Sequence, residues 1–413
     1  MVILGIIQKT HPPLYARLKM TNCASIFSQV LSFFNRSEFA DIVRKHKAEK
    51  HAKGFSCWDQ FVAMSFCQLA KAHSLREIQG GLSCCLGKLK HLGVKNAPKR
   101  STLSYANKHR PWEVYQDLFN QLLGRCQTIA AGKKRRFRFK NKLLSMDATV
   151  IDLCLTMFPW ADFRTTKGAV KLHLLLDHDG YLPTYAHITT AKVHEVNIAR
   201  RLAFPKGSIL AVDRGYNDYS LFAQWTENGV YFVTRMKDNT VYRVIEVRRP
   251  PRNSAIISDQ IIRLTGNKAA EKCPHTLRRI AVWDPKNQKE IVLLTNHLDF
   301  GATTISQIYK ERWQIEIFFK ALKQNLKVKT FIGTSPNALK IQIWTALIAM
   351  LVLKFLQLKS KFSWSLSNLI AMLHWNLFTY RDIWEWIDNP YETPPIVPDY
   401  QQLVLNWTAD GKN

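Results

Sequence analysis

The sequence predicts an α/β protein with a helical N-terminal region, a sheet-forming core interrupted by a β-rich segment, and further helices at the C-terminal end. Three observations support this fold class. Apolar side chains recur at helical spacing through residues 25–131. From residue 143 the pattern changes to short β-branched and aromatic stretches separated by turn residues. Helical spacing returns at about residue 302, and 413 residues, 46% of them hydrophobic, suffice for two or three domains with packed cores.

The N-terminal region, residues 25–131, is predicted to be a helical DNA-binding domain made of short helices. Ser74, and either Ser101 or Thr102, are expected to cap helices within it. A helical scaffold that makes no contact with DNA explains the same pattern equally well. The helices alone therefore predict a fold for this region and leave two functions open.

The charge balance indicates a polyanionic partner. The chain has 59 Lys and Arg against 31 Asp and Glu residues, a formal net charge of +28. Nucleic acid is the leading candidate, and the alternative is a merely basic or ribosome-associated protein. The charge is most concentrated in a linker, residues 132–142, for which we predict phosphate contacts rather than a solvated surface. Its candidate DNA-binding residues are Lys133, Lys134, Arg135, Arg136 and Arg138.

The core is predicted in two parts on either side of an insertion. Residues 143–237 form the first part, in which three consecutive strands joined by hairpins precede a strand–helix–strand unit. Residues 238–300 contain strand patterns without a convincing helix and are predicted to be a β-rich insertion. Residues 301–360 form the second part, and residues 361–413 comprise C-terminal helices and a Pro-rich tail.

Nothing in the apolar segments indicates a secreted or membrane protein. Residues 1–24 are an uncertain extension, without the basic region of a secretory signal, and Met20 is an alternative start. The apolar stretch 341–358 carries Gln342 and Lys354 and is short for a membrane span, so we predict a buried core helix. The eight cysteines show no C-x-x-C spacing and are predicted to be reduced core thiols of a cytoplasmic protein, not zinc ligands.

Two aspartates stand out in the first part of the core. Asp147 lies in the middle of the apolar strand "LLSMDATVIDL", where a carboxylate is costly unless it is paired or binds a metal. Asp152 on the same strand faces the opposite side. Asp213 ends the strand of "SILAVDRGYND", and catalytic groups of open α/β sheets gather at such strand ends. The alternatives are an exposed or capping role for Asp147 and a helix N-cap or turn role for Asp213, although Asp218 is the better candidate for a cap.

A third acid, Glu316, lies on the predicted helix "IYKERWQIEIFFKALKQNL". Tyr309, Arg312, Glu316 and Lys323 fall within an arc of about 60° on a straight helix. This polar stripe borders an apolar face made by Ile308, Ile315, Phe319, Leu322 and Leu326. A surface ion pair of Glu316 with Arg312 or Lys320 is the simpler alternative, and it would contribute only a few tenths of a kcal/mol.

Together the three acids form a chemically sensible set. Two Mg²⁺ ions held by a few carboxylates can activate an attacking oxygen and stabilise a leaving oxygen in phosphodiester chemistry. The tyrosine and the two cations of the stripe would then contact phosphates beside the ions. A strongly basic surface around such a site would hold DNA.

These residues resemble a known family. The pattern Y-x2-R-x3-E-x6-K, met by Tyr309, Arg312, Glu316 and Lys323, is the signature of the insertion-sequence-4 family of bacterial DDE transposases. "SMDATVIDLCL" and "AVDRGYNDY" resemble the regions of its first and second acids. The resemblance extends from about Ser25 to the Pro-rich tail.

The resemblance implies an RNase H-like core in which Asp147, Asp213 and Glu316 bind two Mg²⁺ or Mn²⁺ ions. It also implies DNA-backbone contacts by the tyrosine, arginine and lysine of the signature. The expected function is cut-and-paste transposition: binding of double-stranded terminal inverted repeats, strand cleavage through a hairpin, and transfer to target DNA by a homodimer in the cytoplasm of a bacterium. Trp283, in the insertion, is a candidate to stack on a flipped base.

Two other functions stay open at this point. A non-catalytic DNA-binding protein derived from a transposase would show damage among the acids, and all three are present. A nuclease with the same core that cuts without joining strands differs from a transposase only in the family signature.

Overall fold

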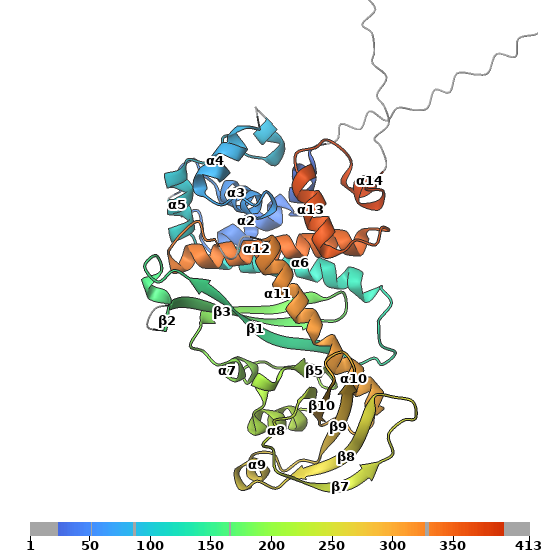
Figure 1. Cartoon of the computed structure of the whole chain (residues 1–413). Helices are drawn as coiled ribbons and strands as arrows, with labels where there is room; N and C mark the ends of the chain where they lie inside the picture. Colours follow the sequence, from blue (N-terminus) through green and yellow to red (C-terminus); the bar gives the residue numbers. More distant parts are fainter. Residues whose placement is uncertain (1–23, 51, 86–87, 165–166, 327–329, 392–413) are drawn as a thin grey trace, which may run out of the picture.

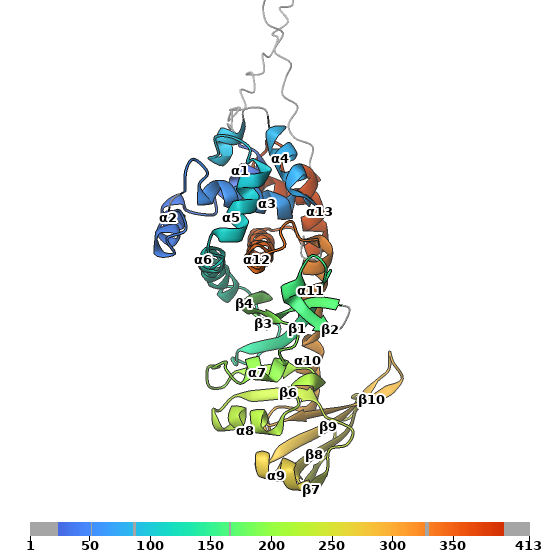
Figure 2. The ribbon, with the colours of Figure 1, turned by 90° about the vertical axis from the view of Figure 1, so that its left-hand side faces the viewer.

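The computed structural model describes residues 24–391 apart from the gaps 51, 86–87, 165–166 and 327–329. A layer of helices lies at one end of a large mixed sheet, and the β-rich segment lies at the other end (Figure 1). Figure 2 shows the same order from another side, with strands β4, β3 and β1 next to the helices and β7–β9 farthest from them. The predicted extension 1–24 and the Pro-rich tail fall almost entirely outside the described residues.

Most of the N-terminal helices are short, as predicted, but α6 has 19 residues. They are α1 (Ile26–Leu31), α2 (Arg36–Lys45), α3 (Cys57–Leu69), α4 (Leu75–Ser83), α5 (Arg100–His109) and α6 (Glu113–Ala131). Ser74 caps α4 by accepting a hydrogen bond from the backbone of Glu77, which confirms the prediction. The predicted cap at Ser101 or Thr102 is wrong, because α5 begins at Arg100 after Lys99, which makes no capping bond. Both hydroxyl residues lie inside the first turn of this helix.

The first part of the core supplies six strands and two helices. These are β1 (Leu143–Leu153), β2 (Asp162–Arg164), β3 (Lys167–Asp177), β4 (Leu182–Thr190), α7 (Glu195–Ala199), β5 (Ile209–Val212), α8 (Tyr219–Glu227) and β6 (Tyr231–Arg235). β3 pairs antiparallel with both β1 and β4, whereas β5 pairs in parallel with β1 and β6. The resulting order is β4-β3-β1-β5-β6, with the short β2 on the other part of β3.

The β-rich segment extends this sheet. Its elements are β7 (Tyr242–Arg248), β8 (Ile256–Leu264), α9 (Asn267–Lys272), β9 (Leu277–Asp284) and β10 (Lys289–Thr295). β10 pairs antiparallel with β6, so the order continues as β6-β10-β9-β8-β7. The expectation of no helix between 238 and 300 is wrong, because α9 packs against α8 and β8. Six residues are too few to show a helical period in the sequence.

The C-terminal helices complete the helical layer. They are α10 (Ala302–Glu311), α11 (Trp313–Asn325), α12 (Pro336–Lys359), α13 (Leu366–Asn376) and α14 (Ile383–Asp388). The backbone N–H groups of Ile26 and Phe27 in α1 donate to Thr379 and Leu377, at 3.0 and 2.8 Å. Residues of α1–α6 and α11–α14 share a hydrophobic core with β1, β3 and β4. The two ends of the described chain therefore fold as one unit.

α12 is the central helix of this layer. It is long and apolar enough to cross a membrane, but 83% of its most apolar stretch is buried inside the protein. It packs against α3, α5, α6 and α13. This confirms the predicted core helix. Ser335 caps it through the backbone N–H of Ala338, and Pro336 occupies the first turn, where a missing N–H costs nothing.

The cysteine prediction is confirmed only in part. Within the described residues the cysteines are free thiols, and Cys57, Cys67, Cys126 and Cys273 are buried. Cys84 and Cys154 are exposed, so they are not core thiols.

Candidate active site

Asp147 and Asp213 lie on adjacent parallel strands. The register of β1 and β5 pairs Met146 with Val212, so the two aspartates follow at the same level. Side chains alternate along a strand, and Leu143 and Ala211 pack in the hydrophobic cluster of α10. Asp147 and Asp213, an even number of residues away, therefore face the side of the sheet on which α10 and α11 lie.

Backbone N–H groups orient both carboxylates. Oδ1 of Asp147 accepts a hydrogen bond of 2.8 Å from the N–H of Ala148. Oδ1 of Asp213 accepts one of 2.8 Å from the N–H of Gly215, at the turn that follows β5. Asp218 caps α8 as predicted, but Asp213 is also a cap, because its bond to Gly215 caps the 3₁₀ turn Arg214–Tyr216.

Glu316 reaches this face from α11, which crosses the sheet at β1 (Figure 1). The predicted apolar face is confirmed, because Ile308, Ile315, Phe319, Leu322 and Leu326 are all buried. The continuous helix over 308–326 is wrong. The chain breaks at Arg312 between α10 and α11, where the N–H of Arg312 bonds to Tyr309, three residues back rather than four.

Arg312 lies between two of the acids. Its Nη2 donates to Oε1 of Glu316 at 2.5 Å, and its Nη1 is 3.7 Å from Oδ2 of Asp147. The side chain is 11% exposed. Burial alone lowers the pKa of Arg312, but the hydrogen bond to Glu316 and the charges of Tyr309, Glu316 and Asp147 outweigh it and raise this pKa. The guanidinium is therefore a fixed positive charge within the site.

The three carboxylates act on one another electrostatically. Burial is the largest cause that raises the pKa of Asp147, and the charges of Asp213 and Glu316 add to it. The N–H of Ala148 and the charge of Arg312 oppose the shift, which brings this pKa to about 7. The side chain of Asp147 is 19% exposed, so water screens these charges only in part. The fold thus concentrates negative charge at the level of Asp147.

The donor set fits a hard divalent cation by its chemistry. Carboxylate oxygens are the protein ligands that Mg²⁺ prefers, and crowded carboxylates gain from a cation between them. Among the described residues, no three His, Cys, Asp or Glu side chains are close enough to hold one ion together in the observed arrangement. Arg312 provides the compensating charge there.

The other two residues of the signature lie along the same helices. Burial raises the pKa of Tyr309, which keeps its hydroxyl protonated, and the ring centroid is 5.8 Å from Cζ of Arg312. Nζ of Lys323 donates to the backbone oxygen of Val150 at 2.7 Å. Lys323 therefore fastens α11 to β1 a few residues beyond Asp147.

The basic linker lies elsewhere, at the β3–β4 turn and the end of α10. Arg135 pairs with Asp179 and Arg136 with Glu311, both at 2.9 Å. The aromatic residues between its cations are packed: Phe137 stacks on Phe139, which contacts Phe300. The five candidate cations of the linker are exposed.

Sequence reasoning missed Glu311, a carboxylate that is only 4% exposed. It binds Arg136 and accepts a hydrogen bond of 3.0 Å from the hydroxyl of Tyr181. A signal was available, because Glu311 lies between Ile308 and Ile315 at helical spacing and so belongs to the apolar face.

Comparison with known proteins identifies the family. Residues 138–352, more than half of the chain, match the family described as Transposase DDE domain. This range contains all three acids and the whole signature. Residues 22–95 match a domain of unknown function, DUF4372.

Individual relatives, which match between about half and three quarters of the chain, agree. A putative transposase of Sinorhizobium fredii (strain NBRC 101917 / NGR234) is 30% identical over 310 residues, which cover 74% of this chain and 84% of that protein. A probable transposase for insertion sequence element IS5377 of Geobacillus stearothermophilus is 29% identical over 263 residues, covering 63% and 68%. The transposase InsG for insertion sequence element IS4 of Escherichia coli (strain K12) is 23% identical over 205 residues, covering 46% and 44%. The chain therefore belongs to the DDE transposases, enzymes that cleave and transfer DNA, and is related to those of insertion sequences.

Proposed function

We propose that the protein is the transposase of a cut-and-paste insertion sequence, and that Asp147, Asp213 and Glu316 are its catalytic carboxylates. The observation that carries this proposal is geometric. Asp147 and Asp213 lie at one level of adjacent parallel strands, and the guanidinium of Arg312 contacts both Asp147 and Glu316, at 3.7 and 2.5 Å. The electrostatics of the three acids agree with this arrangement. The acids come from β1, the end of β5 and α11, yet the charges of two of them raise the pKa of the third. Such perturbed groups cluster at functional sites.

The strand arrangement supports an RNase H-like core made of β1, β3, β4, β5 and β6. Three antiparallel strands are followed by two that run parallel to β1. In this arrangement the first acid lies inside β1 and the second directly after β5. α11 then covers this face and carries the third acid.

We infer that the three acids hold two Mg²⁺ or Mn²⁺ ions. When bound, these ions would activate the attacking oxygen and stabilise the leaving oxygen. The chain itself orients the ligands: the N–H groups of Ala148 and Gly215 fix the two aspartates, and Arg312 fixes Glu316. A guanidinium matches phosphate as well as carboxylate in a bidentate contact, so Arg312 can exchange Glu316 for a DNA phosphate.

The remaining polar groups of the signature are assigned to the DNA backbone. Tyr309, protonated because burial raises its pKa, can donate a hydrogen bond to a phosphate oxygen. Lys323 brings a positive charge to β1 near Val150. The exposed linker cations, the net charge of +28 and the helical N-terminal domain would hold double-stranded terminal inverted repeats and target DNA. Pairing of two ends calls for a homodimer, acting in the bacterial cytoplasm at the nucleoid.

The test is a reaction with DNA that carries the terminal repeats of the element, in the presence of Mg²⁺. We expect nicks, hairpins and strand-transfer products from the natural protein. Asp147→Asn, Asp213→Asn and Glu316→Gln should each abolish cleavage while binding to the repeats persists. Asp152→Asn, an exposed position on the same strand, is the matched control and should cleave normally. Cleavage that survives the three neutral variants would overturn the site assignment, and cleavage without joined products would favour a nuclease.

A further inference from the structure

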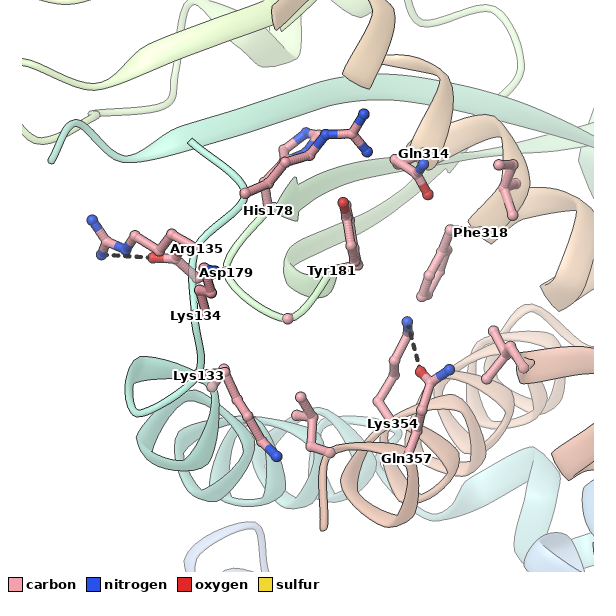
Figure 3. A pocket seen from close by; sticks show the side chains of 16 residues that line it. Lys133, Lys134, Arg135, His178, Asp179, Tyr181, Gln314, Phe318, Lys354 and Gln357 are labelled. Atoms are coloured by element: carbon pink, nitrogen blue, oxygen red, sulfur yellow. Dashed lines mark hydrogen bonds and ion pairs between the residues drawn. The ribbon is translucent and has the colours of Figure 1, made fainter. Parts of the chain in front are cut away.

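A cavity of about 620 Å³ lies behind α11, between this helix, the β3–β4 turn and α12 (Figure 3). Gln314 and Phe318 of α11 line it. These two residues are about 160° from Glu316 around the helix, and Ile317, which also lines the cavity, is about 100° from it. The cavity therefore lies on a different side of α11 from Glu316. The remaining walls come from the basic linker, the β3–β4 turn and α12.

The lining is strongly cationic. It contains five lysine and arginine residues and a single carboxylate, that of Asp179, which Arg135 already binds at 2.9 Å. The four cations of the linker are exposed, and Arg136 is already paired with Glu311 at 2.9 Å. The fifth, Lys354 of α12, is only 8% exposed. Figure 3 shows its amine directed into the cavity.

Lys354 is held without an acidic partner. Among the described residues its contacts are a hydrogen bond of 3.2 Å to Oε1 of Gln357 and the ring of Tyr181, whose centroid is 5.7 Å from Nζ. Burial lowers the pKa of Lys354 to about 8, so the amine still carries its charge at neutral pH. A buried charge without a counter-charge is costly. An anion that enters from the rim would supply the missing partner.

The aromatic part of the wall is held by an unusual backbone. Tyr181 has a φ of 54°, a left-handed conformation that is uncommon for a residue with a Cβ. The preceding Gly180 has a φ of 81°, and a Cβ there would come within 2.9 Å of Ala130 at the end of α6. This strained turn brings the ring of Tyr181 over Lys354 and its hydroxyl to Glu311. Strain of this kind tends to persist where it has a functional use.

We propose that this cavity binds one nucleotide of an unpaired DNA strand, with the base against Tyr181 and Phe318 and the phosphate at Lys354. Cations that follow a backbone, together with aromatic rings for the bases, are typical of single-strand sites. The volume suits a nucleotide. Duplex DNA is too wide to enter a cavity of this volume, and its phosphates could reach only the exposed cations at its mouth. The site shares no residue with the three acids, so it does not depend on their proposed role.

The test measures binding of a fluorescent oligo-dT to the full-length protein in EDTA, where no metal-dependent reaction takes place. Lys354→Met removes the charge and keeps the length of the side chain. The matched control is Lys359→Met, an exposed lysine of the same helix outside the cavity. We expect Lys354→Met to weaken oligo-dT binding about tenfold or more, as the loss of a charged hydrogen bond predicts. Binding of a blunt duplex by both variants should stay within about twofold of the natural protein.

A second measurement avoids the substitution. Acetylation of Lys354 in the natural protein, followed by mass spectrometry, should fall when oligo-dT is present, whereas that of Lys359 should not. Equal binding of oligo-dT by the Lys354→Met and Lys359→Met proteins would overturn the proposal. The proposal would also be overturned if Lys354→Met weakened duplex binding as much as oligo-dT binding, or if oligo-dT left the acetylation of Lys354 unchanged. Competition by dTMP at the same nucleotide concentration would overturn it too, because it would identify a site for the free nucleotide. These binding and acetylation results do not depend on whether the three acids catalyse cleavage.

Discussion

Arg312 and Glu316 form an ion pair of 2.5 Å at the point where α10 ends and α11 begins. The same guanidinium is 3.7 Å from Asp147, so two of the three acids share one cation. The side chain is largely buried, and screening by water is weak. Anything that binds these carboxylates must therefore compete with Arg312.

This competition gives the first prediction. We expect Arg312→Gln to increase the affinity of the DNA-free protein for Mn²⁺, because two carboxylates lose their internal counter-charge. Cleavage of DNA should nevertheless fall, since the phosphate contact is lost as well. Titration of free Mn²⁺ by electron paramagnetic resonance measures the affinity. Lys320→Gln, which removes an exposed charge from the same helix, is the control. An affinity that is unchanged or lower in Arg312→Gln would contradict the prediction.

The second prediction concerns the dependence of stability on pH without metal. Burial and the neighbouring acids raise the pKa of Asp147 to about 7 in the folded protein, against about 3.9 in an unfolded chain. Between these values the folded protein binds more protons than the unfolded chain, so its free energy of unfolding falls as the pH rises from about 4 to about 7. The Asp147→Asn protein has no carboxyl group at this position, so this cause of the fall in its free energy of unfolding is absent. Its stability relative to the natural protein should therefore grow over this range and reach a few kcal/mol at about pH 8.

Thermal unfolding in EDTA at several pH values checks this expectation. Asp152→Asn, which changes an exposed carboxylate of the same strand, should show no such gain. If Asp147→Asn were as pH-dependent as the natural protein, the raised pKa of Asp147 would be refuted.

The third prediction concerns the junction between the β-rich segment and α10. Arg278 forms two hydrogen bonds of 2.8 and 2.6 Å to Asp259, and both side chains are almost fully buried. It also donates to the backbone oxygens of Leu298 and Phe300, just before α10. Asp259→Ala leaves this guanidinium buried without a counter-charge, which should cost about 3–5 kcal/mol of unfolding free energy. Urea unfolding measures the loss.

The neighbouring pair of Arg279 and Glu290 provides the control for this change. These side chains are 3.5 Å apart, and Glu290 is 43% exposed. Glu290→Gln should cost less than about 1 kcal/mol. The double change Arg278→Met with Asp259→Leu should recover part of the stability, because an apolar pair needs no counter-charge. A small effect of Asp259→Ala would show that the junction tolerates an unpaired arginine.

The fourth prediction concerns the contact between the two ends of the described chain. The amide of Gln29 donates to the backbone oxygens of Ala24 and Arg381, both at 2.7 Å, and accepts from the N–H of Ile383 at 3.0 Å. Gln29→Ala should lower the free energy of unfolding by about 1–3 kcal/mol. Limited proteolysis between α13 and α14 should also become faster. Gln121→Ala, an exposed glutamine of α6, should change neither.

Much of the fold could be predicted from the sequence, because the spacing of apolar residues along a helix or strand is a local property. The spacing alone predicted the apolar face of Ile308, Ile315 and Phe319. It also predicted the buried helix α12. The strand positions of Asp147 and Asp213 followed from the same patterns. The short helix α9 was not predicted, because its six residues form a helix through their contacts with α8 and β8.

The features that could not be predicted from the sequence depend on tertiary contacts. A wheel drawn for a straight helix places Arg312 on a continuous stripe, whereas the structure breaks the helix at this residue. The cavity behind α11 joins Lys354 to Tyr181, residues 173 positions apart, through a turn whose strain no periodicity reveals. The meeting of α1 with the segment around Tyr380 is equally non-local.

That meeting of α1 with residues 377–383 has a consequence for how the protein is made. On the ribosome, the N-terminal helices emerge long before the segment that covers them has been translated. Their apolar surfaces stay open until α12, α13 and α14 arrive, and partly folded chains of this kind are prone to aggregate. Native packing is therefore a nearly post-translational event, and a prematurely terminated chain cannot complete the layer that supports α11 and its glutamate.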